Sequence, residues 1–248
     1  MIGIGIGLFA IGVADLIAGG ATGMPETRAR ALLGTAIATL VTLVAGVAFG
    51  MGSRAFELAL VILAASAAWM MLRVGTLTER RAQMALSAHV VGIALLLGAT
   101  GRWDATGRNL VGWIDQLPLP GDATQAVLAA GVLAYLSATS NAVVRVVLAM
   151  AGTQVERSQQ TLRGGRVIGI IERWLIYGLA LAGQPTAAAV IVSAKSVLRF
   201  PELSKVARLE RPSGEASGTP AEVDIVTEYF LLGSMVSWLL ALAPAVLG

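Results

Sequence analysis

Four charged residues stand inside long apolar segments of the chain. Asp15 lies near the end of the first such segment. Glu172 and Arg173 are neighbours in a later one, and Lys195 follows in the next. An ionisable side chain inside a bilayer is costly unless it is paired or reaches water. These residues therefore indicate either charge pairs between helices or a site that binds a charged ligand.

The composition of the chain is that of an integral membrane protein. Hydrophobic residues make up 56% of the 248 residues and charged residues only 13%, and the mean hydropathy is +0.77. Soluble domains carry about 25% charged residues. The chain has no cysteine and one histidine, His89, which excludes disulfides, cysteine-ligated metals and a multi-histidine metal cage. We expect neither a metal nor a cofactor.

Apolar runs of membrane-spanning length recur along the whole chain. A helix needs about 20 apolar residues to cross a bilayer, which leaves room for about eight spans, with seven as the alternative. The sequence therefore predicts an all-α polytopic transmembrane bundle, a single domain over residues 1–248. The predicted spans are 2–20, 31–49, 55–72, 84–100, 123–144, 167–182, 186–200 and 227–246.

The distribution of arginine and lysine predicts how these spans are oriented. Basic residues concentrate in cytoplasmic loops, and eight spans place most of them on one side if both termini are extracytoplasmic. The net charge of +3 then reflects loop bias, so we expect no nucleic-acid partner. The tryptophan-containing segment 101–122 predicts an extracytoplasmic interfacial loop with a short helix. The polar segment 201–225 predicts a flexible cytoplasmic loop.

The predicted topology places polar residues from several spans at one depth. Most of them lie about five residues from the cytoplasmic end of their span, which places them within one or two helical turns of each other. They form a predicted cytoplasm-facing polar layer, which is either a ligand pocket or a set of structural ion pairs. Its members are Asp15, His89, Asn141, Arg145, Glu172, Arg173, Lys195, Ser196, Arg199 and Glu228.

Opposite charges in this layer are expected to face one another. Glu172 and Lys195 stand at similar distances from a predicted tight turn between the sixth and seventh spans, so antiparallel packing would pair them. Asp15 is expected to take Arg145 or His89 as its partner. The remaining expected pair joins Glu228 to Arg173 or Arg199.

Glycine is abundant, with 29 residues. Gly3, Gly5, Gly7 and Gly12 line the first span, and Gly165 and Gly169 have the small-x-x-x-small spacing that lets helices approach closely in lipid. Packing within one bundle is the favoured interpretation of this pattern, and a contact in a homo-oligomer is the alternative.

The last third of the chain carries three short motifs in a fixed order. They are Gly-x-x-x-Gly-x-x-Glu-Arg from Gly165, Ala-Lys-Ser-x-x-Arg-Phe from Ala194 and Glu-Tyr-x-x-x-Gly from Glu228. Together they resemble a bacterial membrane-protein family of uncharacterised role, domain of unknown function 3307. The resemblance implies a location in a bacterial plasma (inner) membrane and a polar layer that is a family feature, and it implies no substrate. The N-terminal half departs from the family pattern, since Ile11 stands where a histidine would precede Asp15.

Three classes of function fit these residues. In the first, the polar layer binds or transports a small anionic or lipid-like ligand, because its positive residues suit a small anion or an anionic lipid headgroup. In the second, the chain is a non-catalytic assembly or partner-binding component. In the third, it is a membrane enzyme that acts on a lipid-linked substrate, with Glu172 or His89 as general base. The sequence has no nucleophile or metal motif, so an enzyme is the least favoured class.

Overall fold

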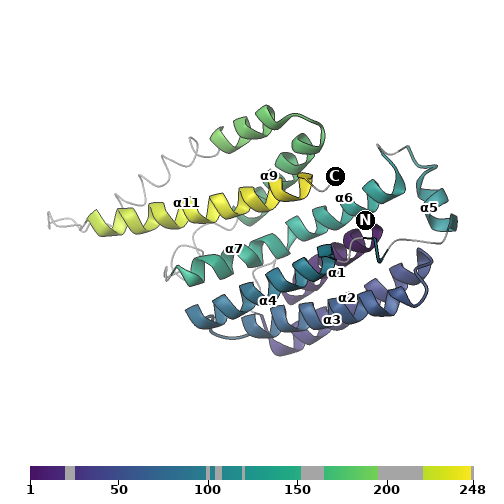
Figure 1. The fold of residues 1–248 in the computed structure, drawn as a ribbon. Coiled ribbons are helices and arrows are strands. Elements are labelled where there is room, and N and C mark those ends of the chain that lie inside the picture. Colours follow the sequence, from purple (N-terminus) through teal and green to yellow (C-terminus); the bar gives the residue numbers. More distant parts are fainter. Residues whose placement is uncertain are drawn as a thin grey trace. The chain divides into compact units, whose positions relative to one another are not determined.

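The computed structural model describes residues 1–19, 26–98, 101–103, 108–118, 121–151, 165–194 and 220–246. Within these ranges every regular element is a helix (Figure 1), as the composition predicts. The chain divides into two compact units, Met1–Met150 and Ala151–Leu247. That residues 1–248 form a single domain stays a prediction.

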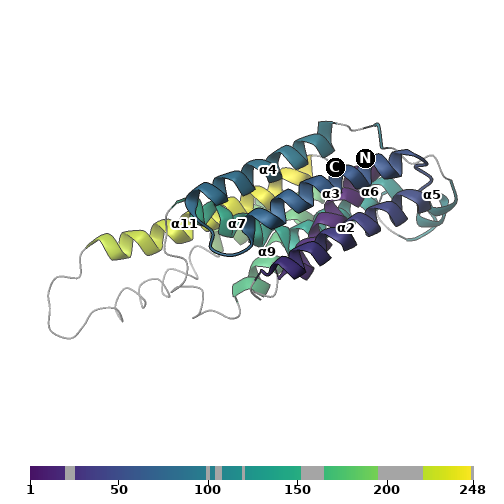
Figure 2. The same ribbon diagram turned by 90° about the horizontal axis from the view of Figure 1, so that it is seen from below.

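The first unit is a bundle of helices joined by short connections, in which α2, α3 and α4 lie side by side (Figure 2). The short helix α5 lies within the segment 101–122, so the prediction of a short helix in this loop is confirmed. The helices are α1 (Ile2–Ala18), α2 (Arg28–Ala48), α3 (Arg54–Arg73), α4 (Glu79–Gly98), α5 (Arg108–Ile114), α6 (Ala123–Ser137) and α7 (Thr139–Met150).

Local signals in the sequence set several of these helix ends. The hydroxyl of Thr27 accepts a hydrogen bond from the backbone N–H of Arg30 at the start of α2. The carboxylate of Asp122 accepts from the backbone N–H of Gln125 at the start of α6. Both are N-caps, which satisfy backbone donors that a helix leaves free. α1 ends at Gly19, whose φ of 105° is a left-handed conformation that glycine adopts without strain.

α1 is the central helix of the first unit. It packs against α2, α3, α4, α6 and α7, and 13 of its 17 residues are buried. A Cβ atom added at Gly12 would lie 2.5 Å from the carbonyl carbon of Ala134, and one at Gly5 would lie 2.6 Å from the carbonyl oxygen of Val127. Small residues therefore set the distance between α1 and α6. For these two glycines, packing within one bundle is confirmed.

The outer surface of the bundle is apolar. α2 turns small residues such as Gly34, Ala38 and Thr42 inward, whereas its bulky Leu40 and Val44 are 58% and 60% exposed. Soluble proteins rarely expose a continuous apolar surface of this kind. Small residues inside and large apolar residues outside suit a bundle whose surroundings are lipid.

Three helices in the described part of the chain, α2, α3 and α4, are long and apolar enough to cross a membrane. α6 and α7 pass the same test together and are bent by 44° at their break, so they add a fourth span if they count as one. α1 is shorter, with 17 residues, or about 25 Å of rise against a hydrocarbon thickness of about 30 Å. Three to four such helices fit a membrane protein, and they are fewer than the eight spans that the sequence predicts.

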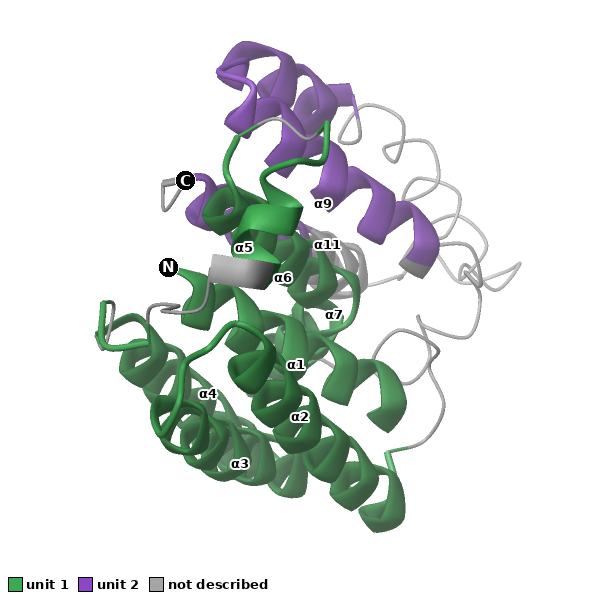
Figure 3. Ribbon diagram, turned by 90° about the vertical axis from the view of Figure 1, so that its right-hand side faces the viewer, with its two compact units in different colours: residues 1–150, 248 green, residues 151–247 purple. Residues whose placement is uncertain are grey.

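The second unit is drawn in its own colour in Figure 3. It contains α9 (Gly165–Leu181), the helix Pro185–Ala194, α11 (Pro220–Leu242) and the 3-10 helix η1 (Ala243–Val246). Ile176, Ala188 and Ala241 form its buried core, one residue from each of the three longer helices. Gly183, with a φ of 69°, turns the chain between α9 and the next helix, so the predicted tight turn at this point is confirmed.

α11 begins earlier than the sequence predicts. The predicted loop runs to residue 225, but residues 220–225 already belong to α11. Proline fits the first position of a helix, because its φ is preset and its missing N–H would have no partner there. Pro220 therefore acts as a start signal and not as a loop residue. Residues 201–219 lie outside the described residues.

Candidate functional site

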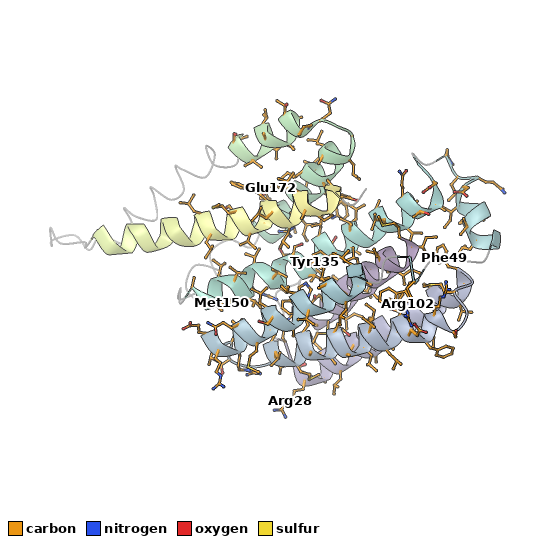
Figure 4. The ribbon with its side chains drawn as sticks, viewed as in Figure 1. Arg28, Phe49, Arg102, Tyr135, Met150 and Glu172 are labelled. Carbon is orange, nitrogen blue, oxygen red and sulfur yellow. The ribbon has the colours of Figure 1, made fainter. Side chains whose placement is uncertain are left out.

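The buried polar groups of the first unit form one connected set around Asp15, here named the Asp15 cluster. α1, α3, α4, α6, α7 and the residues just before α2 each contribute at least one member. Tyr135, which lies among the helices of the bundle in Figure 4, belongs to it. The members are Asp15, Glu26, Trp69, Arg73, His89, Tyr135 and Arg145.

The carboxylate of Asp15, fully buried near the end of α1, is held by two donors from α3. Trp69 donates from Nε1 to Oδ2 at 3.0 Å, and Arg73 donates from Nη2 to Oδ1 at 2.5 Å. Trp69 and Arg73 are four residues apart, so they lie on the same face of their helix. A single turn of α3 therefore binds both oxygens of the carboxylate.

Arg73 makes the most varied contacts in the cluster, and its side chain is only 3% exposed. Its guanidinium carbon lies 4.3 Å from the ring centroid of Trp69, which is a cation–π geometry. Its Nε lies 3.2 Å from Oε2 of Glu26, a charge contact without hydrogen-bond geometry. Its Nη1 has no acceptor among the residues that the structure describes. Buried donors nearly always have partners, so Nη1 marks a position for an additional acceptor.

Glu26 joins α7 to the same cluster. It precedes α2, and its two oxygens face different arginines. Arg145 on α7 donates from Nη2 to Oε1 at 2.7 Å, while Oε2 faces Arg73. A carboxylate between two guanidinium groups thus links the start of α2 to α3 and α7.

His89 extends the cluster toward α6. Its Nε2 lies 2.7 Å from the hydroxyl of Tyr135, in a buried hydrogen bond. On its other side the imidazole packs on Trp69, with ring centroids 4.4 Å apart. The aromatic rings of three helices therefore meet next to the Asp15 carboxylate.

The formal charges of the Asp15 cluster balance. Asp15 and Glu26 are acidic, and Arg73 and Arg145 are basic. Breaking a buried pair by removing one partner costs about 3–5 kcal/mol, because the other charge is left uncompensated. A balanced set can lock helices together. It can hold an additional charged ligand only if the new charge is compensated.

The second unit contains a smaller polar set, here named the Glu172 cluster and composed of Glu172, Arg173, Ser237 and Trp238. Trp238 on α11 donates from Nε1 to Oε1 of Glu172 at 3.1 Å. Arg173 donates from Nη1 to the hydroxyl of Ser237, also at 3.1 Å. Both charged side chains are buried (Figure 4 labels Glu172 on α9). Two neighbours on α9 thus contact two neighbours on α11.

The structure brings three predicted residues together in the first unit: Asp15, His89 and Arg145. The predicted partner of Asp15 is wrong, because Asp15 pairs with Arg73 and Arg145 pairs with Glu26. The reason is helix phase: Arg73 lies on the same face of α3 as the other residues buried against α1.

Other predicted residues are placed differently or not described. The amide of Asn141 donates to the carbonyl of Ser137 in the preceding turn of the chain. Glu228 lies in the first part of α11, residues 220–230, where only the backbone is described. The predicted pairs of Glu172 and of Glu228 therefore stay predictions. Lys195, Ser196 and Arg199 lie outside the described residues.

Four members of the Asp15 cluster were not singled out by the sequence: Glu26, Trp69, Arg73 and Tyr135. A signal for one of them is present, since Arg73 continues the spacing of the buried residues Ile62, Ser66 and Trp69. The predicted span ended at residue 72, which assigned Arg73 to a loop. The spacing of Arg73 from these buried residues places it on the buried face of α3, and this spacing can be read from the sequence.

The opposite end of the bundle holds an exposed ion pair. Arg102, labelled in Figure 4, donates from Nε to Glu57 at 2.8 Å. This hydrogen bond raises the pKa of the Arg102 guanidinium above its ordinary value. Both side chains are largely exposed, so this pair does not resemble the buried Asp15 cluster. Across the described ranges, no group of three acidic or histidine side chains is placed to hold a metal ion.

The chain matches no known family model, no curated protein and no solved structure. Its resemblance to domain of unknown function 3307 over the last third therefore stays a prediction. Any functional conclusion must come from the geometry of the two clusters.

Proposed function

We propose that this chain is a polytopic protein of a bacterial inner membrane, with about eight spans and both termini extracytoplasmic. The apolar outer surface of the first unit supports this proposal. The arginines also support it, because Arg28, Arg30, Arg80 and Arg81 lie at the ends of α2 and α4 that adjoin the Asp15 cluster. Basic residues collect on the cytoplasmic side, so this end of the bundle faces the cytoplasm.

Single-cysteine labelling tests the topology without a background to remove, because the chain has no cysteine. Ser53, Thr76 and Gln184 are exposed residues in three different turns. A membrane-impermeant maleimide should label Ser53→Cys and Gln184→Cys in intact spheroplasts, and Thr76→Cys only after lysis. Labelling of Gln184→Cys only after lysis would contradict the eight-span arrangement.

Within this membrane protein, the Asp15 cluster binds a small anionic or lipid-like ligand at Arg73. The observation that carries the proposal is Nη1 of Arg73, a buried donor with no acceptor among the described residues. A guanidinium presents donors in a planar fork that fits phosphate and carboxylate oxygens. The basic end of the bundle would also attract the anionic headgroups of the cytoplasmic leaflet.

A second function is favoured by the charge balance of the same cluster. The four balanced charges lie on α1, α3, α7 and the segment just before α2, and a structural role requires only that they hold these elements together. In that role the chain is a non-catalytic membrane component that binds partner proteins or a second copy of itself. A structural role needs the charge of Arg73 but has no use for an Nη1 donor that lacks an acceptor among the described residues, and this difference separates the two functions.

Lipid binding by conservative variants tests the choice. Delipidated protein in a neutral detergent is titrated with phosphatidylglycerol, and binding is followed by native mass spectrometry. Arg73→Lys keeps the positive charge but loses the planar set of guanidinium donors. We therefore expect the affinity of this variant for phosphatidylglycerol to fall more than tenfold. The matched control Arg80→Lys, at an exposed position, should stay within twofold of the wild type. Equal affinities of Arg73→Lys and the wild type would favour the structural role.

A further inference from the structure

A buried site with balanced charges restricts what can bind to it. The Asp15 cluster contains two carboxylates and two guanidinium groups, and the side chains of Asp15 and Arg73 are almost completely buried. An anion that entered this site alone would leave one uncompensated negative charge in a medium of low dielectric constant. Such a charge is costly, and ionisable groups avoid the cost by changing their protonation state. Binding of an anion should therefore be accompanied by a proton.

We propose that the Asp15 cluster takes up one proton on the carboxylate of Asp15 for each monovalent phosphodiester anion that binds to Arg73. This inference rests on the proposed function, because it requires that an anion binds at Arg73. It adds the charge class of the ligand and the group that compensates its charge. The proton comes from the cytoplasmic water and returns to it when the anion leaves.

The hydrogen bonds of Asp15 are suited to this exchange. Its Oδ2 accepts from Trp69 at 3.0 Å, and this bond persists when the carboxyl group is neutral, because the neutral group still has acceptor capacity. Its Oδ1, now bound by Nη2 of Arg73, would carry the proton and donate it to an oxygen of the anion. Nη1 and Nη2 of Arg73 would then donate to the same anion. In this arrangement Nη1 of Arg73 gains an acceptor that the described residues do not supply.

Glu26 is less suited to accept the proton. Its carboxylate lies between Arg73 and Arg145, 3.2 Å and 2.7 Å from their nearest nitrogens. Protonation of Glu26 would remove the charge that compensates Arg145. It would also leave the negative charge of Asp15 next to the incoming anion. Both effects are unfavourable, so the proposal assigns the proton to Asp15 and not to Glu26.

The titratable groups that face Asp15 from α4 and α6 are also excluded. The Nε2 atom of His89 is bonded to the hydroxyl of Tyr135. The imidazole packs on the Trp69 ring that also contacts the guanidinium of Arg73. A proton on His89 would place a second positive charge beside Arg73. The phenol of Tyr135 is already protonated and cannot take up another proton.

A monovalent phosphodiester is the chemistry that fits this site, and it has two possible sources. One is the headgroup of an anionic phospholipid such as phosphatidylglycerol, and the other is a small soluble phosphodiester. Arg73 ends α3 at the basic end of the bundle, where headgroups lie. The lipid and dimethyl phosphate, which has the same charged group without acyl chains, distinguish the sources.

The dependence of affinity on pH tests the proton. Both probes stay monoanionic between pH 6 and 8, so any proton taken up on binding goes to the protein. Uptake of one proton per anion predicts that Kd for phosphatidylglycerol rises about tenfold for each pH unit. In Asp15→Asn the amide mimics the protonated carboxyl group, and we expect Kd to change less than twofold over the whole range. The control Arg80→Lys, at an exposed position outside the cluster, should keep the slope of the wild type.

The outcomes separate this inference from the proposed function. Binding that depends on Arg73 but has a flat pH profile in the wild type overturns the proton uptake and leaves the anion site in place. No binding of either probe at any pH overturns both. The wild-type slope needs no variant, so an Asp15→Asn protein that fails to fold does not block the test. Binding of phosphatidylglycerol with the predicted slope, but not of dimethyl phosphate, supports the inference with the lipid as the source.

Discussion

The two units use the same local contact in different surroundings. In each, a tryptophan indole donates to a buried carboxylate, from Trp69 to Asp15 and from Trp238 to Glu172, with an arginine close by. In the first unit the contact belongs to a network of charged and polar side chains from five helices and from the segment before α2. In the second unit it belongs to a contact between two helices, α9 and α11. The first cluster therefore depends on the whole bundle, and the second on one helix pair.

The largest expected effect comes from breaking the charge network of the first unit. Arg73→Met leaves the carboxylate of Asp15 uncompensated, and we expect a loss of about 3–5 kcal/mol in the free energy of unfolding. Unfolding in mixed micelles with increasing dodecyl sulfate measures it. Arg80→Met, at an exposed position, is the matched control and should change stability by less than about 0.5 kcal/mol. Equal losses in the two variants would contradict the network.

Replacing the indole donor of each cluster sharpens the comparison. Trp69→Phe removes the hydrogen bond to Asp15 and weakens the cation–π contact with Arg73, so we expect a loss of about 2–3 kcal/mol. The same unfolding assay measures this loss. A loss below about 0.5 kcal/mol would show that the indole does not hold the carboxylate.

The corresponding change in the second unit should have a smaller effect. Trp238→Phe removes the hydrogen bond to Glu172 but no cation–π contact with a described arginine, and we expect a loss of about 1.5 kcal/mol. Reporter dyes attached to Gln184→Cys and Thr76→Cys assign the loss to one unit. A larger loss than that of Trp69→Phe would mean that the indole contributes more to stability in the Glu172 cluster than in the Asp15 cluster.

The smallest expected effect is at the exposed pair of Arg102 and Glu57. The hydrogen bond raises the pKa of Arg102, but solvent screens the pair, and exposed ion pairs contribute little to stability. Arg102→Gln should leave the unfolding midpoint unchanged within error, at low and at high salt. A shift comparable to that of Trp238→Phe would mean that this end of the bundle is more tightly coupled than its exposure indicates.

Much of the helical organisation could be predicted from the sequence, because apolar runs of sufficient length leave few alternatives to helices. The partners of Asp15 could not. Pairing depends on helix phase, and a shift of one residue turns a side chain by about 100° around its helix. Arg73 was assigned to a loop by a boundary error of one residue. Glu26 lies outside any span, so an apolar-run criterion does not detect it.

The number of membrane spans also does not follow from the composition alone. Composition identifies apolar segments, but α1 has only 17 residues and α6 is separated from α7 by a bend of 44°. Whether such segments cross a bilayer depends on how they pack and not only on their residues. In the second unit the two neighbours Glu172 and Arg173 were predicted as site residues from their sequence alone, and the structure adds Ser237 and Trp238 as their partners.

A double-mutant cycle of Asp15→Asn and Arg73→Met tests the central claim, that these two side chains form a buried pair in the interior of the first unit. The double variant leaves Glu26 paired with Arg145 and strands no charge. We therefore expect it to be more stable than Arg73→Met alone by about 2 kcal/mol or more. Losses that add within about 0.5 kcal/mol would show that the two residues do not interact. That result would contradict both the pair and the anion site built on it.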